Sequence, residues 1–213
     1  MSILLPLAMV VVFGSLVFVF MFWRRLKEDY SSDILFSAGV SMAICTMLFS
    51  AIFFYIANFF FAKSAVFYPE GMWFWGAVVG YLIAYAVSVW RYEMKVYEVF
   101  DAAGIALLLW YAEIIFAYSI IPLYISGLAF FSAVFIFYLS FVWLQKNYKR
   151  LSIFRNSRAG APGLAIIGAL FFVRVLAAYF VPSLVSLVGP IDIVPSSVVA
   201  FLLFFSVYNL SEI

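Results

Sequence analysis

The chain of 213 residues contains seven apolar runs that are each long enough to cross a membrane. The hydrocarbon core of a bilayer, about 30 Å thick, is spanned by a helix of about 20 apolar residues. Only 10% of the residues are charged, whereas soluble domains carry about 25%. These features predict an all-α integral membrane protein, a single polytopic domain with a bundle of about seven transmembrane helices. The expected spans are Ile3–Trp23, Ile34–Phe61, Met72–Trp90, Val99–Ile120, Gly127–Leu144, Gly163–Leu184 and Ile193–Leu210.

The distribution of lysine and arginine predicts the orientation of this bundle. Ten of the twelve basic residues follow the first, third and fifth spans, and so lie on one side of the membrane. Because loops rich in Lys and Arg stay on the cytoplasmic side, we expect the N-terminus outside and the C-terminus in the cytoplasm. No basic segment precedes the first run, so we expect it to remain as an anchor. The ten residues are Arg24, Arg25, Lys27, Arg91, Lys95, Lys146, Lys149, Arg150, Arg155 and Arg158.

Missing residue types exclude several kinds of site. The chain has no histidine, which excludes imidazole ligation of haem or zinc and any histidine general base. Its one cysteine, Cys45, lies inside an apolar run, so no disulfide framework and no thiolate metal site is expected. We therefore expect neither a metal nor a cofactor. With a net charge of only +2 and no basic face, nucleic acid is not an expected partner.

The third apolar run opens on the segment GMWFWGAVVG, whose glycines are Gly71, Gly76 and Gly80. Spacings at or near four residues place glycines on one face of a helix. Such a face has no side chains, so a neighbouring backbone or a lipid can approach it closely.

Three charged residues fall inside expected spans, where ionisable groups are costly and mark candidate sites. Asp101 lies near the start of the fourth span and Glu113 deep within it. Arg174 lies about 12 residues from the cytoplasmic start of the sixth span, near the middle of the membrane. Glu113 has a similar depth, which permits an Arg174–Glu113 pair. Two interpretations remain open: the pair locks two helices together, or Arg174 faces a lipid cavity and binds a phosphate group.

Over nearly its whole length the sequence resembles the prolipoprotein diacylglyceryl transferase family. GMWFWGAVVG resembles the family signature GGMSFHGGLIG, and the basic turn RYEMKVYEVFD resembles the family's basic turn before its next helix. RAGAPGLAIIGALFFVRVLAAYF resembles the family's glycine-led helix. The matching positions are Gly14, Arg24, Arg25, Gly71, Met72, Phe74, Gly76, Gly80, Asp101, Gly163 and Arg174.

This resemblance implies an enzyme of a bacterial-type plasma membrane that transfers a diacylglyceryl group from phosphatidylglycerol to the cysteine thiol of a lipobox-bearing precursor. It implies a catalytic role for Arg174, with Glu113 as a replacement base if burial makes it basic enough. The residues expected to bind the substrate are Gly71, Trp75, Gly76 and Asp101.

The departures fall at the positions that carry the family's chemistry. Trp75 stands where the signature has histidine, and Leu7 stands where the first helix has tyrosine. The family's GRIGNFIN motif is replaced by YAEIIFAYS, and Ala178 replaces a glutamate.

The sequence is therefore compatible with three functions. The first is a divergent but active transferase. The second is a non-catalytic membrane protein that binds lipid or a partner, and the loss of histidine and of the asparagine motif favours this function over the first. The third is a small transporter, which would depend on Glu113 and Arg174 alone, because we detect no inverted repeat.

Overall fold

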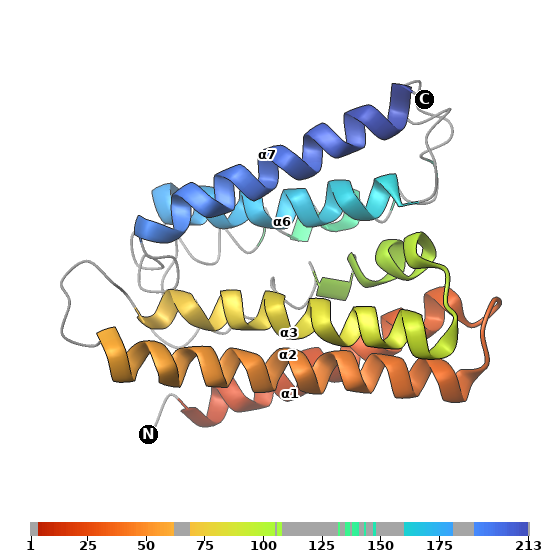
Figure 1. Ribbon diagram of the computed structural model, residues 1–213, viewed down its shortest axis with the longest axis horizontal. Coiled ribbons are helices and arrows are strands. Elements are labelled where there is room, and N and C mark those ends of the chain that lie inside the picture. The colour runs from red at the N-terminus through yellow and green to blue at the C-terminus, as the bar shows by residue number, and fades with distance from the viewer. Residues whose placement is uncertain are drawn as a thin grey trace.

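The computed structural model describes residues 4–61, 69–104, 106–107, 132, 135–136, 138–140, 143, 147, 160–180 and 190–212. All regular secondary structure in these ranges is α-helical, as the apolar runs predict. The helices, labelled as in Figure 1, are α1 (Leu4–Leu26), α2 (Ser32–Phe61), α3 (Pro69–Tyr92), α6 (Ala161–Phe180) and α7 (Pro190–Glu212). A further helical segment covers residues 96–104 and 106–107.

The helices form two groups (Figure 1). In the first group α2 runs antiparallel to α3 along most of its length, and α1 packs against α2. In the second group α6 packs against α7. The main core belongs to the first group and to the segment 96–107. Its fully buried members include Phe18 and Phe22 from α1, Leu35 and Met42 from α2, and Val99.

Gly76 and Gly80 bring α3 into direct contact with the backbone of α2. A Cβ atom added at Gly76 would lie 2.7 Å from the Cβ of Phe53, and one added at Gly80 would lie 2.8 Å from the Cβ of Phe49. Both distances are shorter than a real Cβ contact. The glycine face predicted for this helix is therefore occupied by a neighbouring helix, α2, which confirms the close approach of a backbone at these two positions.

Large apolar side chains cover much of the outer surface. Along α2 they recur every four residues, so they form one continuous ridge on that helix. Its members are Phe36, Val40, Ile44, Leu48, Ile52, Ile56 and Phe60, all at least 40% exposed. Soluble monomers rarely expose apolar patches of this extent. Two helices in the described ranges, α2 and α3, are long and apolar enough to cross a membrane, and most of each is not buried inside the structure.

Candidate functional site at Arg174 between α3 and α6

Arg174 is the largest fully buried side chain in the part of the chain that the structure describes. It extends from α6 toward α3, where its guanidinium carbon Cζ lies 3.8 Å from the centroid of the Phe74 ring. The negative face of an aromatic ring attracts a cation, and the attraction reaches about 2 kcal/mol or more when both groups are removed from water. Phe74, only 4% exposed, therefore offsets part of the cost of burying this charge.

Two further aromatic rings pack against Phe74, the ring beneath this cation. Phe171 precedes Arg174 by three residues and so lies on the same side of α6. Its ring packs edge-on against Phe74, with centroids 5.4 Å apart, and contacts Trp75 at 5.9 Å. Bulky aromatic groups thus fill the space between α3 and α6, whereas glycines close the space between α3 and α2.

This arrangement limits the chemistry that Arg174 can perform. A cation that binds a phosphate group must present its N–H groups to the ligand. Arg174 is 0% exposed, and Phe74 covers one face of its guanidinium group. A lipid phosphate outside the structure cannot reach it in this conformation. Glu113, the predicted partner and alternative base, lies outside the described residues.

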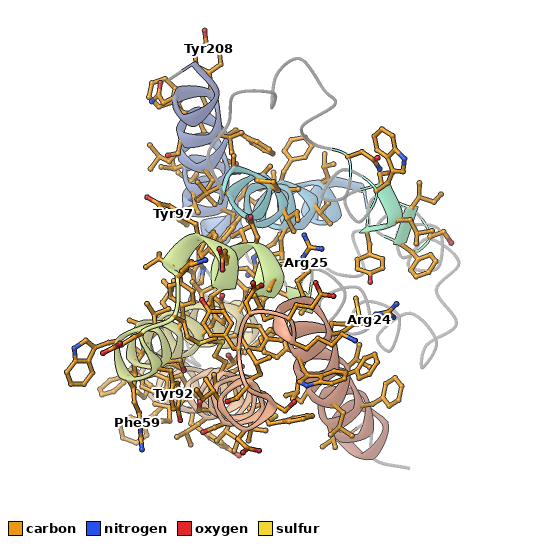
Figure 2. All side chains as sticks on the ribbon, turned by 90° about the vertical axis from the view of Figure 1, so that its right-hand side faces the viewer. Arg24, Arg25, Phe59, Tyr92, Tyr97 and Tyr208 are labelled. Atoms are coloured by element: carbon orange, nitrogen blue, oxygen red, sulfur yellow. The ribbon has the colours of Figure 1, made fainter. Side chains whose placement is uncertain are left out.

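Asp101 belongs to the segment 96–107, and its side chain contacts the beginning of α6. One carboxylate oxygen, Oδ1, accepts a hydrogen bond from the backbone N–H of Gly163 at 2.6 Å, and Oδ2 accepts one from Gly160 at 3.1 Å. The charge of Arg25, at the end of α1, is close enough to act on this carboxylate. Figure 2 shows Arg25 beside the segment 96–107.

The predicted site residues therefore fall into separate environments. Trp75 contacts Phe74, the ring beneath Arg174, and Gly76 faces α2 rather than the arginine. Asp101 lies at a helix end, where its contacts are structural; its predicted role in binding a substrate stays a prediction. Gly71 lies in the first turns of α3, and its surroundings are outside the described residues.

Reasoning from the sequence missed Phe74 as the ring beneath the arginine and Phe171 as the ring that packs against Phe74. The spacing of Phe171 and Arg174 was a usable signal, because residues three apart share a helix face. Phe74 was marked only as a matching position of the family signature, and nothing in the sequence paired it, one of 27 phenylalanines, with Arg174.

Within the described ranges, no three Cys, Asp or Glu side chains come together in a way that could hold a metal ion. The scan against protein-family models and the searches of curated proteins and of solved structures found no match for this chain.

Proposed function

We propose that the protein spans a bacterial-type plasma membrane seven times, with its N-terminus outside and its C-terminus in the cytoplasm. The two long apolar helices, the exposed apolar ridge on α2 and the one-sided distribution of Lys and Arg support this topology. In a bilayer the exposed ridge contacts acyl chains, which are as apolar as its own side chains.

We further propose that the protein is a non-catalytic relative of the prolipoprotein diacylglyceryl transferases that acts as a lipid-facing, partner-binding membrane subunit. The observation that carries this proposal is the complete burial of Arg174 against Phe74. In a transferase, a cation at this position would stabilise the phosphate of the departing glycerol phosphate. Here the cation is used to hold α3 to α6.

The loss of the family's histidine supports the same function. Transfer to a thiol requires a base that removes its proton. The chain contains no histidine, and Trp75, at the signature position, packs against Phe171 instead. The resemblance thus extends to residues that pack helices together, such as Gly76 and Gly80, and fails at the histidine and at the asparagine-bearing motif.

A transfer assay tests the proposal directly. Purified protein is incubated with phosphatidylglycerol and a lipobox peptide, and the mass of the peptide is measured. We expect no added diacylglyceryl group. An added group that disappears in Arg174→Met but persists in the control Arg91→Ala would establish an active transferase instead. Arg91 is a suitable control because it is an exposed arginine at the end of α3.

The structural role of Arg174 has its own test, a double-mutant cycle with Phe74→Leu and Arg174→Met. Phe74→Leu in the natural background removes both packing and the ring beneath the cation, whereas in Arg174→Met it removes packing alone. We expect a coupling free energy of about 1–2 kcal/mol. A coupling near zero would show that the two side chains do not hold α3 and α6 together.

A further inference from the structure

Helix α6 lacks a capping side chain of its own. The helix begins at Ala161, so Gly160 occupies the capping position, where Ser, Thr, Asp or Asn usually accepts a hydrogen bond from a backbone N–H. Glycine cannot do this. The carboxylate of Asp101 takes over the task, because it accepts hydrogen bonds from both Gly160 and Gly163. A negative charge at this end of the helix also complements the helix dipole.

The surrounding backbone is shaped to admit this carboxylate. Gly160 has a φ of +98°, a conformation that side-chain-bearing residues rarely adopt, and the Tyr97 ring packs directly against it. In Figure 2 Tyr97 lies on the side of the segment 96–107 that faces the helices of the second group. A Cβ atom at Gly163 would lie 2.7 Å from Oδ1 of Asp101, and one at Gly104 would lie 3.4 Å from the Gly163 carbonyl oxygen. The segment 96–107 and α6 thus meet backbone against backbone.

This contact determines where α6 begins relative to the rest of the bundle. Arg174 follows Gly163 on the same continuous helix, about 16 Å further along at 1.5 Å per residue. A shift of α6 by one residue would rotate it by about 100° and take the guanidinium group away from the Phe74 ring. Near Arg174, α3 and α6 contact each other through the side chains of Phe171, Phe74 and Trp75 and not through their backbones.

We propose that Asp101 is a positioning residue for Arg174: by capping α6 from a separate helix, it sets the axial and rotational position of α6 and so places the guanidinium group over Phe74. This inference rests on the proposed interhelical role of Arg174. The alternative is that Asp101 stabilises only the first turn of α6, in which case its loss would leave the far part of α6 in place.

Distance measurements between spin labels on α3 and α6 separate these alternatives. Leu82 and Phe172 are both exposed, so cysteines introduced there can be labelled in the full-length protein after Cys45→Ser removes the native thiol. In Asp101→Asn we expect the distance distribution to shift by several ångströms or to broaden clearly. An unchanged distribution would overturn the proposal. The matched control is Glu98→Gln, which removes a carboxylate from the same segment and should leave the distribution unchanged.

A milder variant keeps the test decisive if Asp101→Asn does not fold. Asp101→Glu keeps the charge, but its longer side chain cannot fit between Gly160 and Gly163 in the same way, so a smaller shift or broadening is expected. The double-mutant cycle of Phe74 and Arg174 separates the two proposals. Coupling without any change in label distance would refute the role of Asp101 alone, whereas absent coupling would refute the interhelical role of Arg174.

Discussion

Replacing Gly76 by alanine tests the contact between α2 and α3 most directly. The new Cβ would overlap the backbone carbonyl oxygen of Phe49 and would lie 2.7 Å from the Cβ of Phe53, whereas ordinary contacts begin at 3.4 Å. The two helices must therefore separate locally by at least the 0.7 Å that the Phe53 contact alone requires. A gap of this size removes a quarter to a half of the dispersion energy of each contact it affects. Overpacking of this kind costs about 1–3 kcal/mol.

Gly39→Ala is the matched control. Gly39 is also a helical glycine, on α2, but a Cβ there would meet Val19 at 3.4 Å, an ordinary contact. Alanine is a better helix former than glycine by about 1 kcal/mol, so this variant should be neutral or more stable. The two substitutions change the same atoms and differ only in the space available.

Unfolding by SDS in mixed micelles, followed by far-ultraviolet circular dichroism, measures both variants. We expect Gly76→Ala to unfold at a lower SDS fraction than the natural protein, and Gly39→Ala at the same or a higher one. Gly80→Ala should behave like Gly76→Ala. Equal stability of Gly76→Ala and Gly39→Ala would refute the close backbone contact between α2 and α3.

Three further predictions concern stability measured in the same way. The buried hydroxyl of Tyr81 has no hydrogen-bond partner among the described residues, so Tyr81→Phe should be neutral or stabilising. Tyr85→Phe loses a 2.6 Å hydrogen bond to a backbone carbonyl and should cost about 1 kcal/mol. Equal losses of stability in the two variants would contradict this prediction. Glu93, at the end of α3, has a φ of +52°, so Glu93→Gly should raise the free energy of unfolding by up to about 1 kcal/mol, and a loss would show that the backbone there is not strained. The hydrogen bond from Lys95 to Glu98, together with the charge of Glu98, raises the pKa of Lys95 above its ordinary 10.5. The small stabilisation that Lys95 gains from this pair is therefore present below pH 10.5 and is lost as the pH rises through the higher pKa of the folded state. Glu98→Gln should remove most of this pH dependence, because Glu98 is the largest cause of the shift.

The described helices α1, α2, α3, α6 and α7 coincide with five of the predicted apolar runs, because a long apolar run favours a continuous helix. Most of the expected spans Val99–Ile120 and Gly127–Leu144 lies outside the described residues. The expected span Met72–Trp90 became α3, which begins earlier, at Pro69. Apolarity alone could not place that start. Proline is accepted in the first turn of a helix, because the N–H it lacks would have no partner there. For the same reason α7 begins at Pro190, before the expected start at Ile193.

The candidate site was predicted less completely, and Arg174 shows why. Its depth in a span follows from counting residues along one helix, so the sequence was sufficient to mark it as a candidate. Its aromatic partner Phe74 lies on another helix, and with 22% aromatic residues nearly every helix offers a candidate ring. The predicted pairing with Glu113 stays a prediction, because Glu113 lies outside the described residues.

The sequence by itself determined that this chain is helical, because long apolar segments must satisfy their backbone hydrogen bonds internally. It also determined that α3 has a bare face at Gly76 and Gly80, since helical spacing is a local property. Only the tertiary structure decided what meets that face and which helix receives the carboxylate of Asp101. Gly163 is 62 residues away from Asp101, and contacts across such separations depend on how all the helices pack together. Local spacing carries no information about that packing.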